Sequence, residues 1–238
     1  MSIITTSGKT RKEIIEARAK LEKLAESKAI AANEIPVFYI AEPRAYELLF
    51  RHEHIESLFD VRHLSDIPNQ AAEPFGIDIA YNNGMLTFEQ YKQDHIESDI
   101  LLGIMSAKDI CANVKAAMEI LKNGQRIFAL APYSFLESEK RVKFFREYPI
   151  QKMLISPSRY RVAKNGKFEF TFDGVAYSKS NINYAWYVWE KGWEGKTVIE
   201  WFNYDSQEIY DLKHKDIESA NIDYKLTRSA KKLLRDYL

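Results

Sequence analysis

The sequence predicts an α/β fold: a mostly parallel sheet with antiparallel edge strands, helices on both faces and an added N-terminal helix. Short apolar runs alternate with amphipathic stretches from Val37 to Glu147. After Pro149 the apolar runs follow one another with turns between them and no helical spacing. Alternation of strands and helices is typical of a parallel sheet, whereas successive strands favour antiparallel pairing. The chain has 238 residues, of which 46% are hydrophobic, and this suits one α/β domain with additions.

The first part of the chain predicts a helix and then a strand–helix pair. Residues 10–32 place apolar side chains at helical spacing and charges on the other face. Such a charged face is usually solvated, and only weakly indicates phosphate binding. Val37–Ala41 is typical of a buried strand. Pro43 suits the first turn of the helix that the spacing predicts over 44–56.

The rest of the chain continues the pattern. Pro68 and Pro74 indicate a loop. Further strands are predicted at 58–64, 76–80, 99–104, 126–130, 151–162, 167–173, 183–190 and 197–203, and further helices at 107–122, 134–147 and 225–238. We therefore predict an N-terminal helical extension over 1–35, an α/β domain over 36–204 and a basic helical tail over 205–238.

Composition limits the possible partners and location. Lys+Arg and Asp+Glu both number 34, so the chain has no overall field that would attract nucleic acid, and such binding needs a local basic patch. No apolar run approaches the roughly 20 residues that span a bilayer, and the N-terminus does not resemble a signal peptide. We expect a cytoplasmic protein without a membrane partner. Cys111 is the single cysteine and is expected to be a buried, inert thiol.

Two stretches resemble a known family. Residues 124–141 read GQRIFALAPYSFLESEKR, and residues 184–192 read YAWYVWEKG. Both are similar to the phage and prophage DNA N6-adenine methyltransferase-like proteins, and the resemblance extends from about Pro36 to Phe202. It implies a Rossmann-like class I methyltransferase fold, S-adenosylmethionine (SAM) as cofactor and DNA adenine as the substrate class.

The resemblance places a SAM site after the first strand, where the family carries Glu-Pro-x-Ala-Gly-x-Gly. Glu42 is retained, but Tyr46 and Leu48 stand where the family has glycines. Glycine lets a backbone approach a ligand closely, whereas a side chain would occupy the cofactor's space. Asp66 is either a ribose ligand or a helix cap. Asp78 matches the strand from which the family contacts adenine. Glu42, Asp66 and Asp78 are therefore the candidate cofactor-binding residues.

The catalytic motif is degenerate. After its fourth strand the family reads an acid, four residues and Asn-Pro-Pro-Tyr, whereas this chain has Ile104 at the asparagine and Ala107 at the aromatic position. Methylation of an exocyclic amine needs hydrogen-bond acceptors for that amine and a ring that stacks on the flipped base. Pro132-Tyr133 is superficially similar, but it follows the fifth strand, and Ala131 before it cannot accept a hydrogen bond. We predict no catalytic residue.

Other clusters are weaker. Arg159 and Arg161, in a loop with serines and a tyrosine, are the candidate nucleic-acid contacts, because such residues hold phosphates. The aromatic strand 184–189 is expected to be core or a buried interface rather than a base-stacking platform. The run His52-Glu53-His54 is not a zinc motif, and surface histidines are expected. No metal ligand is predicted.

The sequence therefore favours a catalytically degenerate DNA adenine methyltransferase-like protein that acts by binding nucleic acid or a protein partner. Two alternatives stay open: an active, divergent SAM-dependent DNA (adenine-N6) methyltransferase, and a phage-encoded interaction or inhibitor protein, with a homodimer among its possible forms. The question of enzymatic activity leans towards none. The cofactor is accordingly either none or SAM, and the expected partners are DNA, a second protein or a second copy of the chain.

Overall fold

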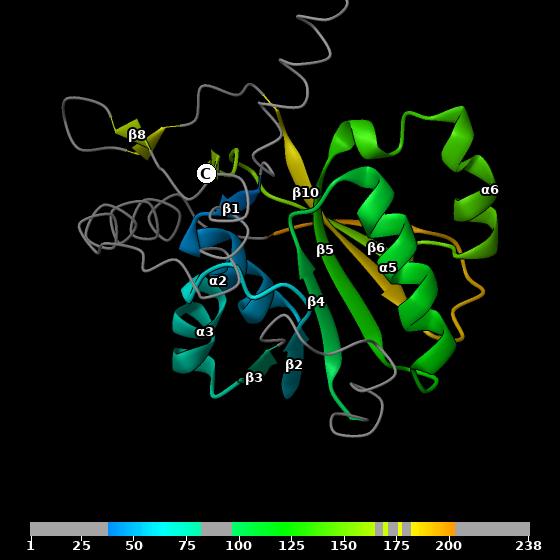
Figure 1. Ribbon diagram of the computed structural model, residues 1–238, viewed down its shortest axis with the longest axis horizontal. Helices are drawn as coiled ribbons and strands as arrows, with labels where there is room; N and C mark the ends of the chain where they lie inside the picture. The colour runs from blue at the N-terminus through cyan, green and yellow to red at the C-terminus, as the bar shows by residue number, and fades with distance from the viewer. Residues whose placement is uncertain (1–37, 82–96, 165–168, 171–175, 178–181, 203–238) are drawn as a thin grey trace, which may run out of the picture. The chain divides into compact units, whose positions relative to one another are not determined.

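The computed structural model describes residues 38–81, 97–164, 169–170, 176–177 and 182–202, which all belong to one compact unit (Figure 1). The helices predicted over 10–32 and 225–238 lie outside the described residues.

A seven-stranded sheet forms the centre of the described unit. Its strand β10 runs antiparallel to both of its neighbours, and all other neighbouring pairs in this sheet are parallel. The predicted mostly parallel sheet with antiparallel pairing on one side is confirmed. In spatial order its strands are β11 (Val198–Trp201), β6 (Lys152–Ile155), β10 (Tyr184–Glu190), β5 (Arg126–Pro132), β4 (Asp99–Gly103), β2 (Ser57–Asp60) and β3 (Asp78–Tyr81).

Helices cover both faces of this sheet (Figure 1). The helix α2 lies on one face, where the Trp186 indole N–H donates to the Ala45 carbonyl. The helices α5 and α6 pack on the other face against a core that includes Phe59, Tyr187 and Trp189. The bounds are α2 (Pro43–His52), α3 (Ile67–Ala72), α5 (Ala107–Ile120) and α6 (Glu139–Glu147), with short 3₁₀ turns η1 (Glu73–Phe75) and η2 (Tyr133–Phe135).

The aromatic strand β10 is core, as predicted. Trp186, Tyr187 and Trp189 are all fully buried. Because side chains alternate across a strand, Trp186 faces α2, whereas Tyr187 and Trp189 meet Phe135 on the opposite face. A strand covered on both faces needs apolar residues at every position, which explains its unbroken aromatic run.

The predicted first strand has a different place. The strand β1 (Tyr39–Ala41) forms, but it pairs antiparallel with β7 (Val162–Lys164) outside the central sheet. In that sheet β2 pairs directly with β4, with Phe59 opposite Ile100, so no strand lies between them. The prediction that residues 37–41 begin the parallel sheet is therefore wrong. A further short pair joins β8 (Glu169–Phe170) and β9 (Ala176–Tyr177).

The loop predicted around Pro68 and Pro74 is also wrong. Pro68 lies in the first turn of α3, and Pro74 lies in η1. Proline has no backbone N–H, but the N–H groups of a first helical turn have no intrahelical partner, so proline is tolerated there. The same principle predicted the helix at Pro43 correctly, and its use at Pro68 would have found α3.

The crossovers run in opposite directions from the middle of the sheet. From β2 the chain passes through α3 to β3, which lies on one side of β2. From β4 it passes through α5 to β5, which lies on the other side of β4. The topological switch point therefore lies between the carboxyl ends of β2 and β4, where open α/β sheets bind ligands.

Candidate functional site

A small crevice lies at this switch point. Its walls come from β1, α2, the loop after β2 and the end of β4, and they include Tyr39, Tyr46, Asp60, Arg62, Gly103 and Ile104. The crevice has a volume of about 20 Å³, which is roughly enough for one water molecule. It is polar on the β2 side and apolar along β4.

The loop after β2 is shaped by Asp60. Its buried carboxylate accepts the backbone N–H groups of Arg62 at 3.1 Å and His63 at 3.0 Å, which ends the strand at residue 60 rather than at the predicted residue 64. His63 has φ 37°, a left-handed conformation that is uncommon for a residue other than glycine. Its ring stacks on Tyr81 with centroids 3.9 Å apart. Burial lowers the pKa of Arg62, opposed by the charges of Asp109 and Asp60.

Tyr46 lies beside the carboxyl ends of β2 and β4, the two strands that define the switch point. Its side chain projects from α2, is 5% exposed and meets Trp186 edge-on at 5.6 Å. A Cβ atom placed on Gly103 would lie 3.6 Å from the Tyr46 hydroxyl, so this hydroxyl reaches the end of β4. Burial, and then the charge of Asp60, raises the pKa of Tyr46 far above its ordinary value.

The crevice does not fit SAM. Sites that enclose a small organic ligand usually have volumes of about 300–1,000 Å³, whereas this one has about 20 Å³. Tyr46, Arg62 and Leu64 line it, whereas a glycine-rich loop would present bare backbone to a ligand. In the loop after β2, the backbone N–H groups of Arg62 and His63 donate to Asp60.

Beside the crevice, Glu42 and Arg44 form a buried ion pair, each 2% exposed, with Arg44 Nη2 2.5 Å from Glu42 Oε1. Arg44 also donates to Ser158 Oγ at 2.5 Å and to the Arg159 carbonyl at 2.6 Å. Glu42 Oε1 further accepts the Arg161 backbone N–H at 3.0 Å. These contacts fasten the loop 156–161 to the start of α2.

The structure brings Glu42, Arg159 and Arg161 together, although the sequence assigned them to two different ligands. The Glu42 carboxylate pairs with both Arg44 and Arg161. The Arg161 Nη1 atom lies 3.4 Å from Glu42 Oε2. Arg161 is half-buried, and Arg159 is exposed. Their predicted roles toward SAM and nucleic acid stay predictions.

The two aspartates lie apart from this group. Asp66 is at the N-cap position of α3 without a side-chain capping hydrogen bond, and its Oδ1 lies 3.5 Å from His63 Nε2. Asp78 is exposed at the amino end of β3, whereas the crevice lies at the carboxyl ends of the strands. Cofactor binding by Asp66 and Asp78 remains a prediction. The sequence missed Asp60, which an acid at the end of a predicted strand could have indicated.

From the end of β4 the chain passes directly into the helix α5. Gly103 has φ 59°, and Ile104 and Met105 are buried. Ser106 is the N-cap of α5 and accepts the Asp109 backbone N–H at 3.2 Å. Of these four residues, only Ser106 has a strongly hydrogen-bonding side chain, and it is used by the cap.

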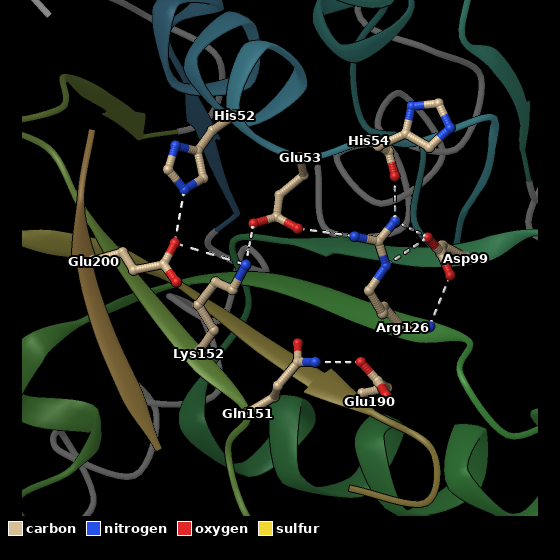
Figure 2. A network of polar contacts seen from close by, with 9 residues as sticks. All are labelled: His52, Glu53, His54, Asp99, Arg126, Gln151, Lys152, Glu190 and Glu200. Atoms are coloured by element: carbon tan, nitrogen blue, oxygen red, sulfur yellow. Dashed lines mark hydrogen bonds and ion pairs between the residues drawn. The ribbon is translucent and has the colours of Figure 1, made fainter. Parts of the chain in front are cut away.

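A second polar cluster joins the amino ends of several strands, whereas the crevice lies at the carboxyl ends (Figure 2). Arg126, the first residue of β5, pairs with Asp99 at 2.7 Å and with Glu53 at 2.8 Å. Lys152, the first residue of β6, pairs with Glu53 at 2.8 Å. The cluster links the end of α2 to three strands, which indicates a structural role.

One side of this cluster has donor atoms suited to a metal ion. His52, Glu53 and Glu200 place their ligand atoms within 4.8 Å of one another. The Lys152 ammonium, however, lies 2.8 Å from Glu53 and 3.7 Å from Glu200, so the chain itself supplies the positive charge (Figure 2). His52 Nε2 donates to Glu200 at 2.9 Å, and a quarter of the His52 side chain is exposed. His54 is 90% exposed, as expected.

Comparisons with known proteins found no matching family model and no matching curated protein. Among solved structures, a predicted O-methyltransferase from Agrobacterium tumefaciens aligns over 74% of this chain and 96% of its own, with 8% identity and a TM-score of 0.43. The O-methyltransferase from Bacillus cereus, solved in complex with SAH, aligns over 73% of this chain and 91% of its own, with 12% identity and a TM-score of 0.34.

A precorrin-6y C5,15-methyltransferase from Geobacter metallireducens aligns over 62% of this chain and 87% of its own, with 12% identity and a TM-score of 0.34. These neighbours are methyltransferases, but likenesses this weak say nothing about what this chain binds. The class that its own strand order and crossovers define is a Rossmann-like α/β fold. None of the helices in the described ranges is long and apolar enough to cross a bilayer.

Proposed function

We propose that this chain is a methyltransferase-fold protein that has lost catalysis and acts by binding nucleic acid or a protein partner. The observation that carries the proposal is the end of β4, where Gly103 and Ile104 line the switch-point crevice and Met105 is buried in the core. Transfer of a methyl group to an exocyclic amine requires acceptors that orient the amine. Ser106, the nearest hydroxyl in sequence, caps α5.

The closed crevice supports the same proposal. The switch-point crevice, with a volume of about 20 Å³, has no preformed room for SAM. We also propose that the chain is related to the phage DNA N6-adenine methyltransferase-like proteins, which residues 124–141 and 184–192 resemble. We further propose that it divides into an extension over 1–35, a domain over 36–204 and a tail over 205–238.

Between the two kinds of partner, the exposed Arg159 favours nucleic acid. The buried Glu42–Arg44 pair holds the backbone of the loop that carries Arg159, because Arg44 donates to the Arg159 carbonyl. A phosphate contact of this kind fixes register without reading sequence. A protein partner is favoured instead by the edge strand β11, where Val198, Ile199 and Trp201 are exposed.

An active, divergent methyltransferase is the second candidate. Asp60 favours it, because a buried carboxylate at the carboxyl end of β2 stands where such folds contact a ligand. This candidate requires the crevice to open when SAM binds.

Two assays on the full chain separate these functions. Incubation with labelled SAM and mixed-sequence duplex DNA should transfer no methyl groups above the level of a protein-free control. Fluorescence anisotropy with the same DNA should show binding that weakens on Arg159→Gln, with Arg146→Gln on exposed α6 as the matched control. SAM-dependent labelling of the DNA would contradict the loss of catalysis. Absence of DNA binding would leave the protein partner as the proposal, to be tested by Trp201→Glu in pull-downs.

A further inference from the structure

Tyr46 lines the switch-point crevice, where a ligand is expected in folds of this class. It is reached from three directions: Asp60 from β2, Gly103 from β4 and Trp186 from β10. A ligand ring in such a crevice would meet the same kinds of surface, namely one acid, one glycine backbone and one aromatic edge.

The packing of Tyr46 is that of a core residue. Its ring lies 5.6 Å from the Trp186 ring and 6.4 Å from the Phe50 ring, and 5% of its surface is exposed. The Trp186 indole is itself fixed by a hydrogen bond to the Ala45 carbonyl, one residue before Tyr46. The first turns of α2 and the crevice wall are thus one packed unit.

The hydroxyl group distinguishes Tyr46 from a phenylalanine at this position. It reaches the end of β4 at Gly103, and Tyr46 shares the crevice wall with Asp60. A phenylalanine at this position would keep the ring and lose the polar end that faces Asp60.

We propose that Tyr46 is an internal occupant of the switch-point crevice, and that its phenol ring takes the place that a ligand ring would have there. This inference rests on the proposed function, because a chain without catalysis can use its cofactor crevice as a packing contact.

The probe is phenol, which is the side chain removed by Tyr46→Ala. Phe and Trp truncations of buried residues cost several kcal/mol, so Tyr46→Ala should lower the Tm by roughly 6–20 °C in a chain of this size. Phenol at about tenfold its Kd should restore about 3–6 °C to this variant. Wild-type protein and Tyr46→Phe should gain nothing from phenol. Phe50→Ala, on the same helix but outside the crevice wall, controls for generic cavities.

The outcomes separate the occupant role from the proposed function. Phenol rescue of Tyr46→Ala that exceeds rescue of Phe50→Ala supports the occupant role. A Tm loss under about 2 °C in Tyr46→Ala, or equal rescue of both variants, would overturn it, as would S-adenosylhomocysteine binding to wild type with a Kd below about 100 µM. The absence of methyl transfer is measured separately and can hold in any of these cases. If Tyr46→Ala fails to fold, Tyr46→Leu replaces it in the same titration.

Discussion

The buried pair Glu42–Arg44 should respond unequally to removal of its two members. Glu42→Gln leaves the Arg44 guanidinium, which is 2% exposed and cannot lose its proton, without a carboxylate. Removing one partner of a buried ion pair costs about 3–5 kcal/mol. For a chain of this size each kcal/mol lowers the Tm by about 2–4 °C, so the loss should be about 6–20 °C.

Arg44→Met should cost less. Glu42 would keep the Arg161 backbone N–H at 3.0 Å and the Arg161 guanidinium at 3.4 Å, so its charge would not be left alone. We expect about 2–3 kcal/mol, mainly from the hydrogen bonds lost to Ser158 and Arg159. The double variant should be more stable than the sum of the two losses predicts, by about 1–3 kcal/mol.

Urea unfolding followed by tryptophan fluorescence gives the three free energies and the coupling between the two sites. Arg146→Met on exposed α6 is the matched control and should stay within about 0.5 kcal/mol of wild type. Two single losses below about 1 kcal/mol that simply add would refute the reasoning. Such a result would mean that the loop 156–161 is not fixed by this pair.

Three further predictions concern other sites. In urea unfolding, Gly103→Ala should cost about 1–2 kcal/mol, because a side chain at φ 59° is strained. Gly76→Ala, at φ 67° in open space, should cost a similar amount. A much larger loss of stability at Gly103 would show a tighter crevice. Burial raises the pKa of the Cys111 thiol, so iodoacetamide should alkylate it more slowly in the folded chain than in urea at pH 8, and equal rates would contradict this. The hydrogen bond from His52 lowers the pKa of Glu200, so its stabilisation is present above the unfolded value of about 4.3 and is lost as pH falls through the lower folded value. Glu200→Gln should flatten the acid limb of the stability curve, and an unchanged limb would count against the pair.

The parts of the fold that the sequence predicts well are those set by local pattern. The unbroken aromatic run of β10 and the alanine-rich helix α5 keep their predicted places, because each is decided by a periodicity within a few residues. The strand β1 was predicted as a strand but placed in the wrong sheet. Which strands pair depends on contacts distant in sequence, here Phe59 opposite Ile100, and no local pattern records them.

The candidate site was predicted in part. Tyr46 was identified as a residue that would fill cofactor space, and it lines the crevice. Asp60, Arg62 and His63 were missed, because the predicted strand ran to residue 64 and hid the turn that the Asp60 carboxylate closes. The pairing of Glu42 with Arg44 and Arg161 could not be predicted, since loop 156–161 returns to α2 only in three dimensions.

Calorimetric titration of the full-length protein with S-adenosylhomocysteine tests the central claim most directly, namely that the switch-point crevice is closed. At about 1 mM ligand the account predicts no heat beyond that of dilution. A saturable signal with a Kd below about 100 µM would contradict it. The crevice would then open around Tyr46, and the active methyltransferase would become the better description of this chain.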